Sequence, residues 1–372
     1  MLRRRCYSRL AAALAKKNLI GLSLEQLQHE LATIPEARKY TAQQVWEHMY
    51  RRGITDFQGM TNLSKTLRSE LDSRYKIHYG HVQLAQVSRD QTRKWLVGFA
   101  DDPRAVVESV LIPEPDRATL CVSSQIGCSL QCSFCHTGTQ KLFRSLTASE
   151  VVGQYMIAAK EANDFNVTKK TVSNMVFMGQ GEPLYNWRQV RQAIKVLTDT
   201  NGIAMPKHKI TVSTSGVVPL IPNVASDVGV SLAISLHATR NDLRDVLVPL
   251  NKTFPLELVL EACTTYAQLM GNRGRRITFE YVMLDGVNDS QSEARDLVRL
   301  LRQLPSHVNL IPFNPWPGSI YRTSKLEKIE NFARIVMEGG VHCTVRRPRG
   351  QDIMAACGQL KSSAEKKRNL VA

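Results

Sequence analysis

Short apolar runs alternate with amphipathic stretches over the larger, C-terminal part of the chain. Most of these runs are separated by stretches with the periodicity of helices, such as 147–163 and 290–304. The runs expected to form strands lie at 118–124, 174–179, 209–215, 230–237, 277–284 and 308–314. A repeated strand–helix order predicts an α/β fold with a parallel sheet.

Six strand–helix units are too few for a closed eight-stranded barrel. We therefore predict a partial (β/α)6 barrel that is open on one side, with its chemistry at the C-terminal ends of the strands. An open doubly wound sheet is the alternative fold.

The N-terminal part of the chain has a different pattern. Leu24, Leu27 and Leu31 recur at helical spacing, whereas residues 81–112 are richer in β-branched residues. The predicted division of the chain is a basic arm at 1–18, a small helical accessory domain at 19–80, a β-rich connector at 81–115, the partial barrel at 116–350, and a C-terminal segment with a basic tail at 351–372.

The balance of charge points to a polyanionic partner. The 372 residues include 49 Lys and Arg against 33 Asp and Glu, which gives a formal net charge of +16. Such a surplus is most often found in proteins that bind nucleic acid, although a solvated basic surface or an organellar composition also produces it. No run of eighteen apolar residues is present, so we expect no membrane association.

The first seventeen residues contain four Arg, two Lys and no acidic residue. This composition is typical of a mitochondrial presequence, and equally of a basic arm in a bacterial protein. We therefore expect a cytoplasmic protein if the source is bacterial and a mitochondrial matrix protein if it is eukaryotic. A secreted protein is not expected, because eight cysteines are too few for a disulfide scaffold in a chain of this length.

Three cysteines form a tight motif directly after the first predicted strand. Cys128, Cys132 and Cys135 have the spacing C-x3-C-x2-C. Zinc takes four tetrahedral ligands, and no second cysteine pair is available here. Three thiolates suit a [4Fe–4S] cluster whose fourth iron stays open. Such an iron can chelate S-adenosylmethionine and reduce it to a 5′-deoxyadenosyl radical. The spacing does not explain Cys121, seven positions earlier.

Polar residues gather where the predicted strands end. Taken singly, most residues of these types are caps or turn residues. Because the ends of parallel strands meet at one edge of a sheet, we expect the set to line a common site. Its members are Gly181 and Glu182 after the second strand, Ser213 and Ser215 at the third, Ser235 and His237 at the fourth, and Asn314 at the sixth.

Several segments resemble one enzyme family. "CSLQCSFC" resembles the radical S-adenosylmethionine motif, and "GQGEPL" resembles the glycine-rich segment that meets the amino group of this cofactor. Further matches are "CVSSQIGC", "TVSTSG", "AISLHA", "IPFNPWPG" and "AACGQL". Together, from about residue 19 to 360, they resemble the RlmN-type dual-specificity RNA methyltransferases. Those enzymes methylate carbon 2 of an adenosine in large-subunit ribosomal RNA and in certain tRNAs.

The resemblance implies roles for individual residues. Cys357 corresponds to a cysteine that is methylated during turnover, Cys121 to a second redox cysteine that forms a transient disulfide with it, and Glu108 to an acid/base glutamate. Cys128, Cys132 and Cys135 would hold the cluster. The residues that would line the S-adenosylmethionine site are Gly181, Glu182, Ser213, Ser235, Leu236, His237 and Asn314.

The chemistry explains why two further cysteines are needed. Carbon 2 of adenine carries no useful nucleophile, so a workable route uses two S-adenosylmethionine molecules per turnover. Cys357 takes a methyl from the first, the radical derived from the second removes a hydrogen from that methyl, and the carbon then joins RNA to Cys357. Attack of Cys121 on the Cys357 sulfur would release the base. Either Glu108 or Cys121 could take the carbon 2 proton.

The implied partners are rRNA, tRNA or both, and an external one-electron donor of the flavodoxin or ferredoxin type, acting on a monomeric enzyme. RNA would meet the helical accessory domain and basic segments, and its target adenine would be flipped into a pocket. The candidate basic residues are 272–276, 346–349, Arg51, Arg52 and Lys65.

Three alternatives stay open at this point. A related enzyme class methylates carbon 8 of the same rRNA base, and we favour carbon 2 because "GEPL" and its flanking motifs look more like that type. A radical enzyme acting on a small molecule would not need Cys357. A zinc-dependent RNA-binding module would not catalyse a reaction at all. No functional role is expected for Cys6, Cys263 or Cys343.

Overall fold

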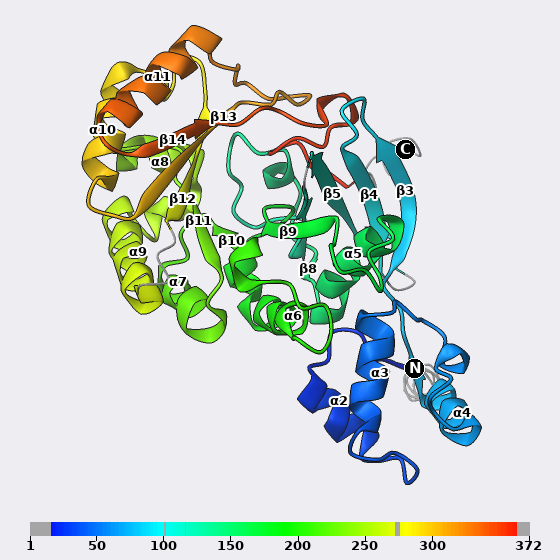
Figure 1. Ribbon diagram of the computed structural model, residues 1–372. Helices are drawn as coiled ribbons and strands as arrows, with labels where there is room; N and C mark the ends of the chain where they lie inside the picture. Colours follow the sequence, from blue (N-terminus) through cyan, green and yellow to red (C-terminus); the bar gives the residue numbers. More distant parts are fainter. Residues whose placement is uncertain (1–15, 100–101, 116, 272–275, 363–372) are drawn as a thin grey trace, which may run out of the picture.

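A ten-stranded mixed sheet forms the centre of the computed structural model, which describes residues 16–99, 102–115, 117–271 and 276–362. The strand order is β14-β13-β12-β11-β10-β9-β6-β5-β4-β3, with β14 and β3 at the two edges. Figure 1 shows the strands following an arc from β14 to β3. Residues 1–15 of the predicted basic arm, most of the basic segment 272–276 and the tail beyond 362 lie outside the described residues.

The larger part of the sheet is parallel. Its strands are β6 (Arg117–Cys121), β9 (Val172–Phe177), β10 (Ile210–Thr214), β11 (Ser231–Ser235), β12 (Ile277–Met283), β13 (Ser306–Pro312) and β14 (His342–Val345). The first six correspond to the six predicted strands, and the α/β partial barrel is confirmed. β14 was not expected, because this short edge strand is largely exposed and has no apolar run.

The remaining strands form an antiparallel meander. They are β3 (His81–Val87), β4 (Arg93–Gly98) and β5 (Val106–Glu114). β5 pairs with β6 so that Val110 lies opposite Cys121, which makes the meander continuous with the parallel strands. The segment expected to be a connector therefore extends the sheet, and its inner face borders the functional site described below.

Helices cover the parallel strands. They are α5 (Ala148–Glu161), α6 (Trp187–Thr198), α7 (Ile221–Asn223), α8 (Asn241–Leu247), α9 (Leu256–Met270), α10 (Gln291–Leu301) and α11 (Leu326–Glu338). Of these, α6, α9, α10 and α11 lie along the outside of the arc of strands (Figure 1). The longer helices are amphipathic and bury their apolar stripe against the sheet. Among the described residues, no helix combines the length and apolar character needed to cross a bilayer.

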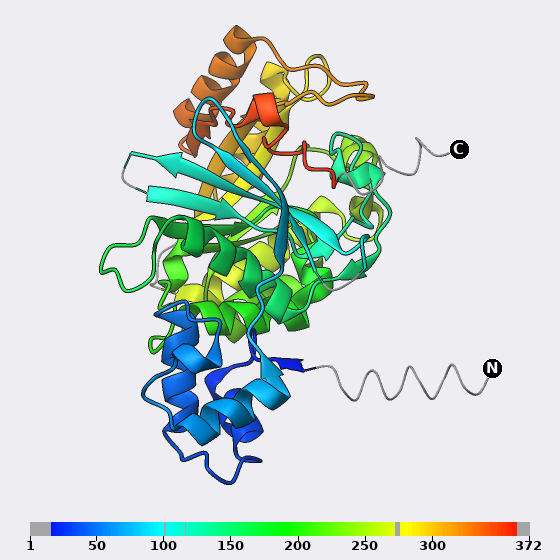
Figure 2. The same ribbon diagram turned by 90° about the vertical axis from the view of Figure 1, so that its right-hand side faces the viewer.

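The N-terminal helices form a separate group next to α6. They are α2 (Leu24–Leu31), α3 (Thr41–Tyr50) and α4 (Lys65–Arg74), with the short parallel pair β1 (Lys17–Asn18) and β2 (Tyr75–Lys76). Figure 2 shows this group at the end of the molecule below the sheet. Gly21 fixes the group, because its N–H donates to the Tyr50 hydroxyl at 2.9 Å and its carbonyl accepts from Gln192 on α6 at 3.1 Å.

Candidate active site

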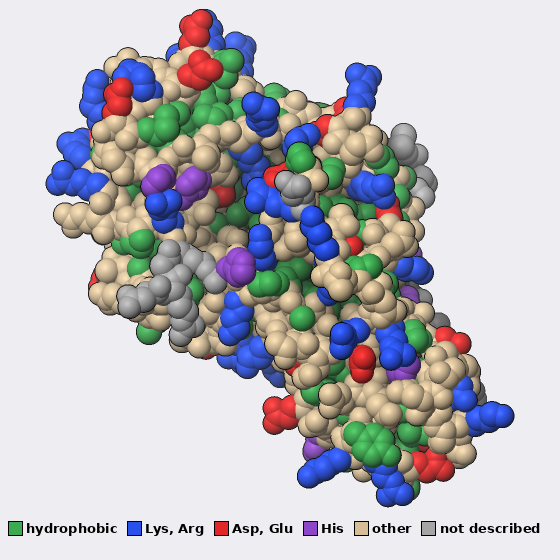
Figure 3. Space-filling model, viewed as in Figure 1, with side chains coloured by type: hydrophobic (Ala, Val, Ile, Leu, Met, Phe, Trp, Pro, Cys, Tyr) green, Lys and Arg blue, Asp and Glu red, His purple; other side chains and the backbone are tan. Residues whose placement is uncertain are grey.

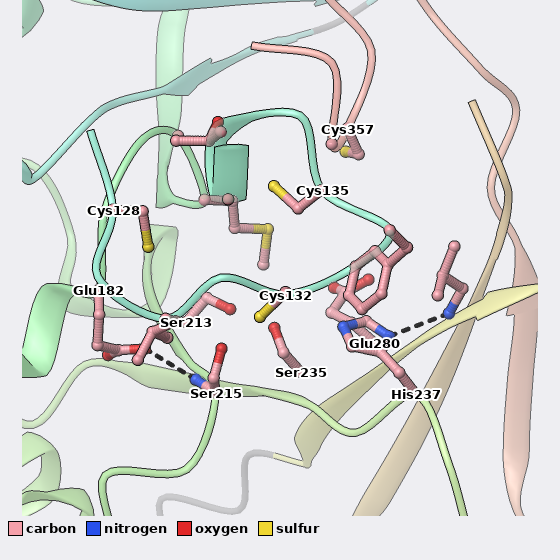
Figure 4. Close-up of a pocket in the computed structure, with 18 of the residues that line it drawn as sticks. Cys128, Cys132, Cys135, Glu182, Ser213, Ser215, Ser235, His237, Glu280 and Cys357 are labelled. Carbon is pink, nitrogen blue, oxygen red and sulfur yellow. Dashed lines mark hydrogen bonds between the residues drawn. The ribbon is translucent and has the colours of Figure 1, made fainter. Parts of the chain in front are cut away.

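A cavity opens at the C-terminal ends of the parallel strands, and three cysteines line it. Cys128, Cys132 and Cys135 all belong to the loop between β7 (Gln125–Ile126) and β8 (Arg144–Ser145). These two short strands pair antiparallel and close the base of the loop. In Figure 4 the three sulfur atoms face a common space.

Two successive tight turns bring the cysteines together. The Cys135 N–H donates to the Cys132 carbonyl at 3.0 Å, and the Gly138 N–H donates to the Cys135 carbonyl at 3.0 Å. A side chain at position 138 would place its Cβ 2.7 Å from the Cys132 carbonyl oxygen, so glycine is needed there. The turns that bring the cysteines together are therefore closed by residues that are close in sequence.

The chemistry of these thiols fits an iron–sulfur cluster better than a zinc ion. Burial raises the pKa of Cys128 to about 11 and also raises the pKa values of Cys132 and Cys135, so ionised thiolates need a cation close by. Within the described ranges, no group of three or more His, Cys, Asp or Glu side chains is arranged to share one metal ion. Three thiols around a larger space can instead each bind a different iron of a polynuclear cluster.

A buried carboxylate lies in another wall of the same cavity. The Oε1 atom of Glu182 accepts from the Leu184 N–H at 3.0 Å and Oε2 accepts from the Ser215 N–H at 2.9 Å. Burial raises the pKa of Glu182 to about 7. The preceding Gly181 has a φ of +94°, and a Cβ there would lie 2.4 Å from the Cβ of Gln125. The glycine-rich segment thus brings a carboxylate, held by backbone N–H groups, into the cavity.

The ends of β10 and β11 complete this wall. Ser213, Ser215, Ser235 and His237 line the cavity, as predicted from their positions at the strand ends. The Nδ1 atom of His237 accepts from the Val282 N–H at 3.1 Å, and burial lowers the pKa of His237 to about 3. The imidazole is therefore neutral, with its proton on Nε2 and available to donate.

Two of the expected cofactor residues lie elsewhere. Leu236 is fully buried, its N–H donates to the Glu280 carbonyl, and its carbonyl accepts from Arg244. Asn314 lines a second cavity, described below. As far as the described residues define the first cavity, neither of the two is part of its wall.

Sequence reasoning missed two buried charged residues at this site. Glu280 lines the cavity and accepts from Asn309 at 2.8 Å, and burial raises its pKa. Arg244 is fully buried behind the strand ends, where it donates to the carbonyls of Ser215 and Ser235 at 2.8 and 3.0 Å. A charged residue inside the apolar run 277–284 is a signal that could have identified Glu280, whereas nothing local marks Arg244 as buried.

The second cavity adjoins the first and contains the other two cysteines of interest. Cys121, at the end of β6, lines it together with Asn314. Cys357 and Arg346 belong to the walls of both cavities. A negative charge on Cys357 raises the pKa of Arg346, and Glu280 adds to this effect. The structure therefore brings Cys121 and Cys357 into one cavity beside the three-cysteine loop.

The turn that carries Cys357 lies directly on the three-cysteine loop. The His136 N–H donates to the Gly358 carbonyl at 2.8 Å, and the Thr137 hydroxyl donates to the Leu360 carbonyl at 2.6 Å. From the other side, the Asn314 side chain donates to the Cys357 carbonyl at 3.2 Å. These contacts place Cys357 at the top of the cavity in Figure 4.

Glu108 is buried on β5, close to this turn but in a different environment from the cysteines. Its carboxylate pairs with Lys94 at 3.1 Å and accepts from the Lys361 N–H at 2.7 Å. Burial raises the pKa of Glu108, and Lys94 opposes that shift. In the part of the chain that the structure describes, Glu108 lines neither cavity, so it would have to change partners to reach a substrate in either.

The remaining candidates are placed as follows. Within the described ranges, Cys263 and Cys343 line neither cavity, and Cys6 lies outside those ranges. Arg51 and Arg52, directly after α3, and Lys65, at the start of α4, are exposed. Lys and Arg side chains also surround the middle of the face shown in Figure 3. This distribution suits a long polyanion better than a small anion.

Comparisons with known proteins agree with this geometry. Residues 17–77 match the family described as the ribosomal RNA large subunit methyltransferase N-terminal domain, and residues 122–300 match the radical SAM superfamily. A radical SAM methyltransferase from Sphaerobacter thermophilus has a similar crystal structure, with a TM-score of 0.86 and 42% sequence identity. The similarity covers 93% of this chain and 99% of that one.

Curated relatives named dual-specificity RNA methyltransferase RlmN match almost the whole chain. The protein from Rhodopseudomonas palustris strain BisB5 is 52% identical over 365 residues, covering 95% of this chain and 91% of the relative. The protein from Azorhizobium caulinodans is 51% identical over 376 residues, covering 96% and 92%. With both family domains in place and identity near one half over nearly the full length, this chain belongs to the RlmN family of dual-specificity RNA methyltransferases, within the radical SAM superfamily.

Proposed function

We propose that this protein methylates carbon 2 of adenosine in large-subunit rRNA, in tRNA or in both, through a methylated cysteine and a covalent protein–RNA adduct. The observation that carries this proposal is the position of Cys357. It belongs to the walls of both cavities, so it can face the three-cysteine loop on one side and Cys121 on the other. A radical enzyme without a cysteine methyl carrier has no need for this arrangement.

Membership in the radical SAM superfamily implies S-adenosylmethionine and a [4Fe–4S] cluster. When bound, the pair supplies a transferable methyl and a 5′-deoxyadenosyl radical. Cys128, Cys132 and Cys135 would each hold one iron. Gly181, Glu182, Ser213, Ser235 and His237 line the same cavity, which supports a role in holding the cofactor. Leu236 and Asn314 do not line this cavity as far as the described residues define it, so any effect on the cofactor would be indirect. Asn314 would act by binding the Cys357 carbonyl.

Glu182 and His237 would orient the cofactor. The Glu182 carboxylate is held by two backbone N–H groups and can pair with a cationic amino group. A bound cation would also favour its ionised form, which burial otherwise disfavours. The neutral His237 ring presents an N–H donor and adds no charge to the site.

Cys357 would carry the carbon atom to the RNA. Its thiolate displaces a methyl from the first S-adenosylmethionine and becomes a thioether. That methyl would then give one hydrogen atom to the 5′-deoxyadenosyl radical, and the remaining carbon radical would add to carbon 2 of adenine, so that the base is joined to Cys357. As the carbon 2 proton leaves to a base, one electron returns to the external one-electron carrier, and the aromatic ring is restored. Two S-adenosylmethionine molecules are thus consumed in each turnover.

Cys121 would release the product. Its thiolate attacks the Cys357 sulfur, the carbon–sulfur bond breaks, and the carbon takes a proton to become the new methyl group. The two cysteines are then joined in a disulfide, which an external thiol must reduce before the next turnover. The shared cavity supports this role for Cys121. Glu108 and Cys121 both stay candidates for taking the carbon 2 proton, Glu108 on condition that it exchanges its present partners.

The proposed partners follow from the same chemistry. Exposed basic side chains support binding to rRNA or tRNA. An external one-electron donor of the flavodoxin or ferredoxin type is required because forming the radical consumes one electron. We further propose that the enzyme acts as a monomer. The compartment, cytoplasm or mitochondrial matrix, stays an expectation that rests on residues outside the described ranges.

An anaerobic assay of the reconstituted protein with an rRNA fragment and with tRNA tests the proposal. We expect 2-methyladenosine by mass spectrometry of the digested RNA, in one substrate or both. If 8-methyladenosine is the sole product, the choice of carbon 2 is wrong. If no RNA is methylated but a small molecule is, the RNA substrate is wrong.

A further inference from the structure

A buried lysine and a buried glutamate hold both ends of the turn that carries Cys357. Lys94 Nζ donates to Glu108 Oε1 at 3.1 Å and to the carbonyl oxygen of Met354 at 3.3 Å. The other carboxylate oxygen of Glu108 accepts from the backbone N–H of Lys361 at 2.7 Å. Cys357 lies between these two backbone contacts, so one ion pair fixes the chain on either side of it.

The sheet places this ion pair on the same face as Cys121. Lys94 on β4 lies opposite Val110 on β5, and Val110 lies opposite Cys121 on β6. Glu108 is two residues before Val110, so its side chain points to that face as well. Lys94 and Glu108 are diagonal neighbours across two strands, within reach of long side chains. The ion pair and Cys121 therefore form one surface, and the turn with Cys357 packs on it.

The burial of this ion pair indicates a role other than stabilising the fold. Only 9% of the Lys94 side chain and 7% of the Glu108 side chain are exposed. A buried ion pair contributes little net stability over apolar residues of the same size, because both charges lose their hydration. In this chain both partners also bind the backbone of the Cys357 turn. An apolar pair could fill the space but could not make these bonds.

We propose that Lys94 is a positioning residue, which holds Cys357 at the boundary of the two cavities through Glu108 and the Met354 carbonyl. Cys357 would then be held where it borders the first cavity on one side and the cavity of Cys121 on the other. The inference rests on the proposed role of Cys357. It assigns Lys94 no contact with the substrate or the cofactor.

The first test measures methyl transfer to Cys357 in the absence of RNA, by intact mass of the reconstituted protein with S-adenosylmethionine. Lys94→Met should lower the maximal rate by about tenfold or more, because a reacting group displaced by about 1 Å can lose far more than that. The concentration of S-adenosylmethionine giving half-maximal rate should stay unchanged, since the cofactor wall is intact. Lys94→Arg, which can still donate to both oxygens, should recover part of the rate.

Arg93→Met is the matched control. Arg93 precedes Lys94 on β4, points to the opposite face and pairs with Glu161 in a half-exposed ion pair. This variant removes a cation and an ion pair from the same strand. Its methylation rate should stay within about twofold of the original, because most exposed ion pairs contribute little to stability. The double variant Lys94→Met/Glu108→Gln removes both charges. It therefore separates loss of the backbone contacts from the cost of an unpaired carboxylate, and it should be as slow as Lys94→Met.

The second test does not depend on activity. Hydrogen exchange of the backbone amides from Ala355 to Lys361 reports how firmly the turn is held. We expect exchange to be faster in Lys94→Met and in the double variant than in Arg93→Met, with equal iron content in all three. Unchanged exchange in the turn, or an equal loss of methylation in Arg93→Met, would overturn the proposal. If the original protein does not methylate Cys357 at all, the proposed function fails, and the exchange data still decide whether Lys94 holds the turn.

Discussion

The chain assembles its two groups of cysteines in different ways. Cys128, Cys132 and Cys135 lie in one loop, whose tight turns are closed by bonds between neighbouring residues. Cys121 and Cys357 are 236 positions apart, and they meet only because the C-terminal segment packs across β5 and β6.

The shape of the loop and the position of Cys357 therefore depend on different contacts. The loop can take its shape from local turns, and a cluster bound to it would tighten it further. The position of Cys357 depends on contacts from several distant elements, including Lys94, Asn314 and His136. Changes to the loop should therefore affect cofactor binding, whereas changes around Cys357 should affect methyl transfer while the cofactor stays bound.

The largest effect should come from the loop. Cys132→Ala removes one of three thiolates, so we expect most of the iron and sulfide to be lost and RNA methylation to fall to background. Iron and sulfide analysis with visible absorbance measures this directly. Cys263→Ala, which removes a buried thiol from α9, is the control and should keep its iron. Full iron content and activity in Cys132→Ala would contradict a cluster-binding role for the three-cysteine loop.

Cys357→Ala should abolish RNA methylation without loss of iron. The loop is intact in this variant, but no sulfur is available to carry the methyl. The protein should therefore show no gain of one methyl by intact mass, while Cys343→Ala on β14 should behave as the original. Full RNA methylation by Cys357→Ala would contradict the carrier mechanism.

Cys121→Ala should slow product release more than the earlier steps. Cys357 can still be methylated and joined to RNA, but no neighbouring thiol can attack its sulfur. We expect a covalent protein–RNA species on a denaturing gel with labelled RNA. The double variant Cys121→Ala/Cys357→Ala should give none. Absence of the adduct from Cys121→Ala alone would count against a resolving role.

The smallest effect concerns the buried carboxylate of Glu182 in the first cavity. The pKa of Glu182 is about 7 in the folded chain against an ordinary value of 4.5. Between these values the folded chain keeps a proton that the unfolded chain has released, so the free energy of unfolding falls as pH rises through this interval. The loss amounts to about 3 kcal/mol.

Glu182→Gln should remove this pH dependence. Unfolding in denaturant at pH 5 and pH 8, without S-adenosylmethionine, measures it. The original protein should lose more stability between the two pH values than the variant does, whereas Glu261→Gln, at an exposed position, should resemble the original. An identical loss in Glu182→Gln would show that Glu182 is already ionised in the folded chain.

Much of the fold could be predicted from local patterns. The six apolar runs correspond to β6 and β9 to β13, because buried parallel strands need continuous apolar sequence. β14 was missed because an exposed edge strand carries no such signal. The continuation of the sheet into β3, β4 and β5 was also missed, since sequence periodicity shows that a strand exists but not which strand it pairs with.

The candidate site was predictable to a similar extent. The cysteine spacing and the residues at the strand ends identified most of the first cavity. Lys94 and Arg244 were not identified, because each lies in a segment where a basic residue is ordinarily exposed, and only packing from distant segments buries them.

The sequence by itself therefore determined the three-cysteine motif, the glycine-rich turn before Glu182 and the positions of the six parallel strands along the chain. Each of these leaves a local pattern: a cysteine spacing, a glycine at positive φ and a continuous apolar run. Only the tertiary structure decided that Cys357 lies beside Cys121, and that Lys94 and Glu108 hold its turn in place. Those contacts join residues more than 200 positions apart. No local sequence pattern indicates which residues will meet over such a separation.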